Sequence, residues 1–330
     1  MLPLFSRRLS FAVVSFAIAG LAASCQVGKG PSQSLTAPMP SSMPGEMPTA
    51  MPSEAPTAMP TGMPTAMPTG TPSTMPTAMP SASASMAPVA MNAYALTQNN
   101  GLIAFDRNDP TTAQAPMAIT GLAAEEMLVG IDFRATDMMI YAVSNQGRIY
   151  SIDADTGMAT AAAEMPFEGG VMGTHFGVDF NPTVDRVRLH SDETQNLRLH
   201  PDTGARLAVD GTLAYVEGDS AFGSAPVLVA TAYTNPVPNA ESTQLYAIDS
   251  AKDTLVLLPS PNDGGVTTVG PLGIDVSEDA ALDINVEGEA YAILSVNNSS
   301  AVYRIDLSTG LATQVGMLGD QPIIGMALVL

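Results

Sequence analysis

From Asn92 onward the chain is a succession of short runs in which β-branched and aromatic residues alternate with polar ones. Clusters of Gly, Asn and Asp separate the runs, and no stretch shows a convincing 3.6-residue period of an amphipathic helix. Alternation of period two is typical of β-strands that bury one face. Residues 92–330 therefore predict an all-β domain.

The predicted strands recur in units with a common order. Residues 129–165 and 281–318 both open with a hydrophobic-Asp-hydrophobic run, continue with a Tyr-Ala strand and end after a Thr-Gly turn. Four short strands in about 40–50 residues match the size of one β-propeller blade. Openings of this kind occur at 129–133, 176–180, 229–233, 281–285 and 324–328.

The two ends of the domain complement each other. Residues 93–110 supply a second and a third strand without a first, and residues 324–328 supply a first strand with nothing after it. Joined, they complete one blade and hide strand edges that would otherwise aggregate. We therefore predict a β-propeller of five four-stranded blades closed by N- and C-terminal strands. Six blades, if residues 229–280 are split, or a β-sandwich are the alternatives.

The first ninety residues differ in composition from the rest. Residues 1–24 combine Arg7 and Arg8, an apolar stretch shorter than the ~20 residues of a membrane-spanning helix, and small residues before Cys25. The sequence LAASC resembles the lipobox of bacterial lipoproteins, which implies a signal peptide and lipid on Cys25. Residues 25–91, rich in Met, Pro and Thr, predict a disordered stalk, because proline removes backbone donors and fixes φ. The expected location is extracytoplasmic, lipid-anchored in the bacterial envelope at the outer membrane or cell surface, or secreted.

Seven motifs along the second part of the chain occur in a characteristic order. They are YALTQNNGLIAFD, LVGIDFR, FGVDFNPTVDRVRLHSDETQNLRLHPDTG, TLAYVEGD, TAYTN, LYAIDS and VGPLGIDV. With these motifs the chain resembles secreted bacterial proteins that carry domain of unknown function 4394, over about residues 92–330. The resemblance implies propeller-like repeats on exported proteins, and it implies no established activity or ligand.

Three blade openings carry an aspartate at the same position, namely Asp132, Asp179 and Asp283. If the first strand of each blade is innermost, these carboxylates lie near the axis, where they could hold a hard cation such as Ca²⁺. The alternative is that each accepts backbone N–H bonds from the next blade. The sequence DADTG at 153–157 resembles the start of a calcium loop, but its counterparts at 201–204 and 306–310 indicate a recurring hairpin turn. No other cofactor is predicted.

The stretch 180–204 concentrates basic side chains in a chain with 32 acidic and 12 basic residues. It predicts the second and third strands of the third blade. Two hypotheses account for the basic residues: ion pairs between blades, with Asp179, Asp185, Asp192 and Asp202 as candidate partners, or a site for an anionic ligand. The candidate ligand-binding residues are Arg186, Arg188, His190, Arg198 and His200.

Sequence signals for catalysis are weak. There is no GxSxG motif and no cysteine apart from Cys25, and a net charge of −20 argues against nucleic acid as a partner. We therefore expect a monomeric, non-catalytic binding or scaffold protein for an unknown protein, polymer or small ligand. The alternative is an extracytoplasmic hydrolase or lyase near the axis, which uses the three aspartates with His175 or a metal ion.

Overall fold

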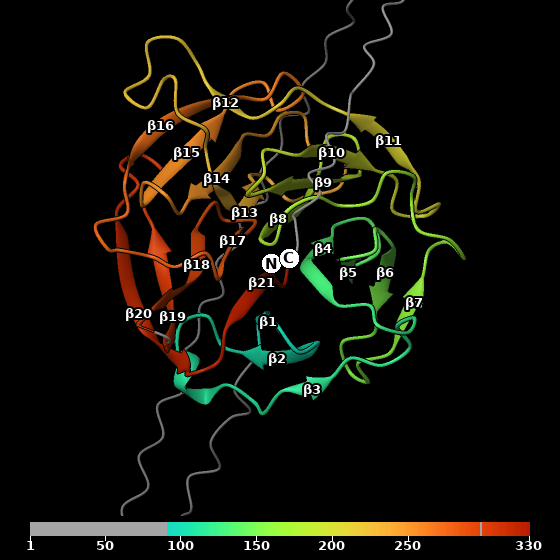
Figure 1. Ribbon diagram of the computed structural model, residues 1–330. Coiled ribbons are helices and arrows are strands. Elements are labelled where there is room, and N and C mark those ends of the chain that lie inside the picture. The colour runs from blue at the N-terminus through green and yellow to red at the C-terminus, as the bar shows by residue number, and fades with distance from the viewer. Residues whose placement is uncertain (1–90, 298) are drawn as a thin grey trace, which may run out of the picture. The chain divides into compact units, whose positions relative to one another are not determined.

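Twenty-one strands arranged in five sheets make up the part of the chain that the computed structural model describes, residues 91–297 and 299–330. The sheets surround a common axis as the blades of a propeller (Figure 1). The predicted signal peptide at 1–24, Cys25 and the predicted stalk up to residue 90 lie outside these residues. Within the described range no helix is long and apolar enough to cross a membrane.

The first blade joins the two ends of the described domain. Its strands, from the axis outward, are β21 (Ile323–Leu328), β1 (Ala93–Thr97), β2 (Gly101–Phe105) and β3 (Met117–Ala118), and the 3₁₀-helix η1 (Pro110–Thr112) connects β2 to β3. Strands β21 and β1 are antiparallel, with Ala93 opposite Leu328. The predicted closure by N- and C-terminal strands is therefore confirmed.

The other four blades follow in chain order. Blade two contains β4 (Leu128–Arg134), β5 (Met139–Ser144), β6 (Ile149–Ile152) and β7 (Ala159–Ala161). Blade three contains β8 (Phe176–Asn181), β9 (Arg186–Ser191), β10 (Asn196–Leu199) and β11 (Arg206–Val209). Blade four contains β13 (Leu228–Tyr233), β14 (Leu245–Asp249), β15 (Thr254–Leu258) and β16 (Gly265–Pro271), with β12 (Ala214–Tyr215) added in parallel to β16. Blade five contains β17 (Ala280–Ile284), β18 (Ala290–Val296), β19 (Ser299–Ile305) and β20 (Ala312–Gly319).

Five blades are therefore present, as the repeat predicted, and the alternatives of six blades or a β-sandwich are wrong. The long unit 229–280, which suggested a sixth blade, forms the single blade β13–β16; β12, which precedes this unit in the sequence, adds a fifth strand at the outer edge. The Thr-Gly sequences are hairpin turns, as predicted: Gly157, Gly204 and Gly310 have φ of 70°, 64° and 84°, and each donates its N–H to the carbonyl four residues earlier. A positive φ is the conformation that glycine adopts without strain.

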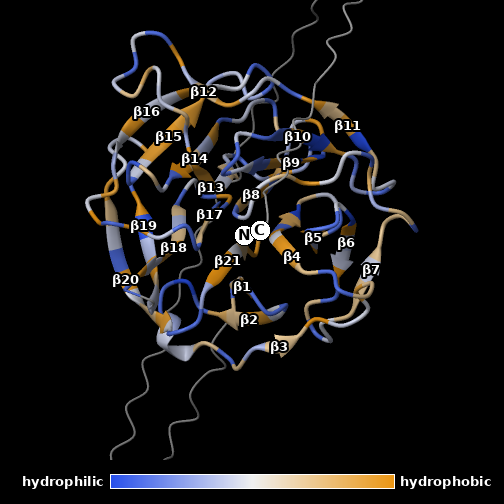
Figure 2. Ribbon diagram, in the orientation of Figure 1, coloured by the Kyte–Doolittle hydropathy of each residue, from blue (hydrophilic) through white to orange (hydrophobic). Residues whose placement is uncertain are grey.

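Apolar side chains fill the spaces between neighbouring blades, and hydrophobic residues lie along the strands of every blade (Figure 2). At four of the five interfaces both blades contribute apolar residues. The interface between blades three and four is different, because strands β8–β11 contribute none to its cluster, which is formed by blade four together with Leu213 and Tyr215. Arg188 of blade three lies on that side, where it donates hydrogen bonds to Tyr233 and Asn262 of blade four.

Candidate functional site

The innermost strands β21, β4, β8, β13 and β17 pack side by side around the axis (Figure 1). Since they run in the same direction, their first residues meet at one end of the axis and their last residues at the other. The first end contains a cavity, which we call the mouth. The second end contains the three predicted aspartates, which we call the axial trio.

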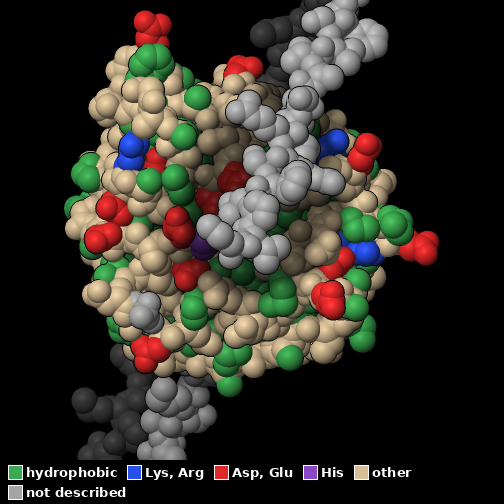
Figure 3. Space-filling model, viewed as in Figure 1, with side chains coloured by type: hydrophobic (Ala, Val, Ile, Leu, Met, Phe, Trp, Pro, Cys, Tyr) green, Lys and Arg blue, Asp and Glu red, His purple; other side chains and the backbone are tan. Residues whose placement is uncertain are grey.

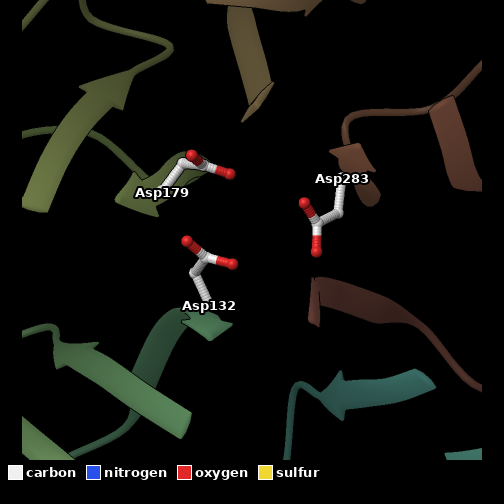
Figure 4. A group of neighbouring side chains, drawn as sticks. All are labelled: Asp132, Asp179 and Asp283. Atoms are coloured by element: carbon white, nitrogen blue, oxygen red, sulfur yellow. The ribbon is translucent and has the colours of Figure 1, made fainter. Parts of the chain in front are cut away.

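The axial trio consists of Asp132 on β4, Asp179 on β8 and Asp283 on β17. One oxygen from each carboxylate lies within 4.8 Å of the other two, and the three side chains point toward a shared space (Figure 4). The residues are only 3–5% exposed. The structure thus brings together all three residues that the repeat predicted to lie at the axis.

Each carboxylate of the axial trio accepts a backbone N–H from the innermost strand of a neighbouring blade. Phe180 on β8 donates to Asp132 at 2.7 Å, Tyr233 on β13 donates to Asp179 at 3.0 Å, and Leu328 on β21 donates to Asp283 at 2.6 Å. Asp132 and Asp283 also accept the N–H of the residue that follows each of them. Two oxygens of Asp132, one of Asp179 and two of Asp283 are therefore bonded to backbone, five of the six in the trio. The trio connects innermost strands of neighbouring blades.

Burial dominates the electrostatics of the trio. It raises the pKa of Asp132 well above the usual value, and the charge of Asp283 raises it further, against the hydrogen bonds from Phe180 and Phe133. The pKa of Asp179 is raised by burial and by both other carboxylates. Burial raises the pKa of Asp283 to about 7 although Leu328 and Ile284 donate to it. Three carboxylates held together away from water favour the protonated state.

The mouth is a cavity of about 390 Å³ at the opposite end of the same strands. Its floor is formed by apolar residues near the start of the innermost strands: Leu128, Val129, Phe176, Val229, Ala280 and Ile324. Its rim carries polar side chains, among them Gln98, Asn145, Thr174, His175 and Glu278. A concave apolar surface with a few polar groups is typical of a small-ligand site.

Acidic side chains surround His175 at the rim of the mouth. Its Nδ1 lies 3.3 Å from Asp192 and 3.5 Å from Glu278, and its Nε2 lies 3.7 Å from Asp279. We call these four residues the rim cluster. A space-filling view shows acidic side chains around a histidine near the centre of this face (Figure 3).

Close backbone packing separates the mouth from the axial trio. A Cβ on Gly177 would lie 2.7 Å from the backbone nitrogen of Thr231, and one on Gly130 would lie 2.6 Å from Val178. The space between these strands is about 10 Å³, which is at the lower limit for one water molecule. His175 and Asp179 are four residues apart on one extended segment, about 13 Å of strand. The rim cluster and the axial trio therefore cannot act on the same reacting atom.

The most buried basic residue of blade three is bonded on all sides. Arg188, 1% exposed, donates to Tyr233 at 3.2 Å, Asn196 at 2.7 Å, Asp210 at 2.6 Å and Asn262 at 2.6 Å. Because Tyr233 and Asn262 belong to blade four, this network joins blades three and four. It occupies the N–H donors that an anionic ligand would need.

Asp210 also accepts two hydrogen bonds from Arg198, at 2.7 and 2.9 Å. Arg186 donates to the backbone carbonyls of Val184 and Asp185, and the ring of His200 accepts the N–H of Asp202. The structure therefore brings Arg188 and Arg198 together on one carboxylate and leaves Arg186 and His200 apart from them.

His190 is fully buried beside Arg188, and neither ring nitrogen has a hydrogen-bond partner among the described residues. Burial, together with the charge of Arg188, lowers the pKa of His190 to about 3. Its imidazole is therefore neutral at physiological pH.

Three groups of site residues escaped the sequence interpretation. Glu278 and Asp279 lie in the connection before β17, and no other blade has an acidic pair at that position. Asp210 lies just after β11, the outermost strand of blade three, and is not part of the repeated pattern of blade openings. Arg134 pairs with Asp185 and Asp202 of blade three, two of the candidate partners that the sequence had suggested for the blade-three arginines. An acidic pair beside a blade opening was the one available signal for the rim.

Comparisons with solved structures find chains of low sequence identity. A chain of the nidogen/laminin complex is 12% identical, with 72% of this chain and 97% of its own covered and a TM-score of 0.42. A structural genomics protein of unknown function from Bacteroides thetaiotaomicron VPI-5482 is 14% identical, with 68% and 58% covered and a TM-score of 0.39. Dihydro-heme d1 dehydrogenase NirN in complex with DHE is 13% identical, with 68% and 43% covered and a TM-score of 0.36. These likenesses carry no conclusion about function.

No curated protein matches the sequence. A family model described as a domain of unknown function, DUF4394, matches residues 101–327. That match contains parts of all five blades, the axial trio and the rim cluster. The chain therefore belongs to the family of domain of unknown function 4394.

Proposed function

We propose that this protein is an extracytoplasmic, non-catalytic binding or scaffold protein whose propeller presents its ligand site at the mouth. The observation that carries the proposal is the cavity of about 390 Å³ where the five innermost strands begin. An apolar floor with a polar rim is the usual construction of a small-ligand site. The ligand could be a small molecule or an exposed group of a protein or polymer.

The alternative of a hydrolase or lyase has less support. It required the axial aspartates to act with His175 or a metal ion, but backbone packing separates His175 from the trio. Five of the six trio oxygens are bonded to backbone N–H groups. A catalytic group must reach the atom on which it acts.

The axial trio is assigned to the framework in this proposal. Its carboxylates connect innermost strands of successive blades, and Ca²⁺ binding is the competing hypothesis because one oxygen of each lies within 4.8 Å of the others. Anion binding at the basic residues of blade three also remains a hypothesis. A phosphate titration that perturbs the fluorescence or stability of the wild type, but not of Arg198→Gln, would support it.

The place of the protein in the cell is part of the proposal. Lipid on Cys25 would hold the chain in the bacterial envelope, with residues 25–91 as a tether between membrane and propeller. Replacing Cys25 with alanine should then move the protein from the membrane fraction to the soluble fraction. Unchanged fractionation would contradict lipid anchoring and leave the proposal for the mouth intact.

A matched pair of tryptophan variants tests the mouth as the ligand site. Gln98 lines the cavity, whereas the adjacent Asn99 is exposed and does not. In a thermal-shift screen of a small-molecule library, compounds that stabilise the wild type should also stabilise Asn99→Trp and fail to stabilise Gln98→Trp. Equal stabilisation of the two variants would place the binding site elsewhere.

A further inference from the structure

We propose that the mouth binds a small organic cation, with its ammonium group at Glu278 and its apolar body on the cavity floor. This inference rests on the proposed function and adds the chemical class of the ligand. Three features of the mouth carry it: the apolar floor, the absence of Lys and Arg from the described residues of the lining, and one carboxylate that faces the cavity.

The floor can accept an apolar body but offers it few hydrogen bonds. Leu128, Phe176, Val229 and Ile324 come from four different blades and line the same cavity, each at the first or second position of its strand. Burial of apolar ligand surface there contributes about 25 cal/mol per Å² before the costs of binding are subtracted. A ligand without an apolar part would gain none of this contribution.

The residues that line the mouth indicate the sign of the ligand's charge. Among the described residues that line the mouth there is no Lys or Arg, and the rim cluster adds Asp192 and Asp279 beside Glu278. The chain as a whole carries a formal charge of −20. A concave site lined by one sign of charge concentrates ligands of the opposite sign. An anionic ligand would meet the carboxylates of the rim cluster without a Lys or Arg among the described lining residues to offset them.

Glu278 is the carboxylate of the rim that remains available to a ligand. Asp192 accepts the Thr174 N–H at 3.0 Å, the Thr174 hydroxyl at 2.7 Å and the His175 N–H at 3.1 Å. Although burial acts to raise its pKa, these hydrogen bonds leave the pKa of Asp192 below its usual value. Asp279 accepts the side-chain amide of Gln98 at 2.6 Å. The Glu278 side chain is 56% exposed, and its carboxylate lies 3.5 Å from Nδ1 of His175.

The test compares three probes that share one apolar chain: n-hexylammonium, n-hexanol and n-hexanoate. Binding to the full chain is followed by NMR through the labelled methyl groups of methionine. Met127 lines the mouth and is identified by the signal that Met127→Leu removes, and the exposed Met158, outside the lining, serves as the reference signal. We expect n-hexylammonium to shift the Met127 signal saturably and more tightly than n-hexanol, with n-hexanoate weakest.

Charge variants then locate the preference. Glu278→Gln should weaken n-hexylammonium about fivefold, the effect of one partly exposed charge pair, and leave n-hexanol unchanged. The matched control is Glu287→Gln, an exposed residue of the turn after β17 that does not line the mouth. It should leave all three affinities unchanged.

The outcomes separate this inference from the proposed function. Equal affinities for n-hexylammonium and n-hexanol at Met127, or a preference for n-hexanoate, would overturn the cation and leave the mouth as a ligand site. If none of the probes shifted the Met127 signal, both the inference and the mouth as a ligand site would be overturned. If Glu287→Gln lost the preference for n-hexylammonium to the same extent as Glu278→Gln, the preference would come from the net charge of the protein. A local pair between the ligand and Glu278 would then be contradicted.

Discussion

Two acidic groups lie on the same axis of this propeller and differ in what surrounds them. The axial trio is almost fully buried, and backbone N–H groups occupy five of its six oxygens. The rim cluster faces a cavity, and Glu278 keeps an exposed carboxylate there. Carboxylates therefore connect strands at one end of the axis and are available for binding at the other. Their access to water makes the difference.

The largest expected effect of a single substitution in this comparison is on stability. Asp132→Ala leaves the N–H groups of Phe133 and Phe180 without their acceptor, and each unsatisfied buried group costs about 1–3 kcal/mol. Relief of the repulsion from Asp283 offsets part of that cost, so we expect a loss of about 2–4 kcal/mol in urea unfolding.

Glu278→Ala is the matched change at the rim. Surface substitutions usually alter stability by less than about 0.5 kcal/mol, and we expect that here. If Asp132→Ala were as stable as the wild type, or Glu278→Ala as unstable as Asp132→Ala, the division between framework and binding site would not hold.

The repeat in the sequence made the axial trio predictable, but it gave no indication of the rim cluster. Asp132, Asp179 and Asp283 share one position on innermost strands, so the symmetry of a propeller brings them together. Glu278 and Asp279 lie in the connection before β17 and are not part of the repeated strand pattern. His175 precedes the innermost strand of blade three, and only the tertiary structure places it beside Glu278 and Asp279.

The interface between blades three and four shows the same limit. One of the two hypotheses from the sequence was that the arginines of this blade form ion pairs between blades. The acidic partner of Arg188 is Asp210, however, which lies beyond β11, and its blade-four partner Asn262 is far away in sequence. Of the candidates near in sequence, Asp185 and Asp202 bind Arg134 of blade two instead. Local alternation predicted the strands and their polar faces, but partners that come from loops depend on the tertiary structure.

The second expected effect is a pH dependence that comes from the trio. The pKa of Asp283 is about 7 in the folded chain and about 3.9 in an unfolded one, so the folded state binds the proton more tightly. Its contribution to stability is therefore present below about pH 4 and is lost as the pH rises toward 7. Relative to the wild type, Asp283→Asn should gain stability with rising pH over this window, by at most about 1.4 kcal/mol per pH unit.

The measurement is the difference between the unfolding free energies of the two proteins at each pH. His190 acts in the opposite direction, because its folded pKa of about 3 lies below the unfolded value of about 6.5. Its contribution is lost as the pH falls from about 6.5 toward 3, and it cancels in the difference because both proteins contain it. A difference that stays constant between pH 4 and 7 would contradict the buried, repelling trio.

The smallest expected effect is that of calcium. If the backbone N–H bonds suffice to hold the trio, adding Ca²⁺ or a chelator should leave the melting temperature of the wild type unchanged. A true site at a Ca²⁺ concentration 100 times its Kd would add about 2.7 kcal/mol. A stabilisation of that size, absent from Asp179→Asn, would make the trio a metal site and reverse its assignment to the framework.

The most direct test of the division is the affinity for n-hexylammonium in two variants, Glu278→Gln at the rim and Asp132→Asn in the trio. Each replaces one carboxyl group on the same axis with an amide of similar shape. We predict that Glu278→Gln raises the Kd about fivefold and that Asp132→Asn leaves the Kd unchanged in the folded protein. An increase in Kd for Asp132→Asn with none for Glu278→Gln would contradict the account.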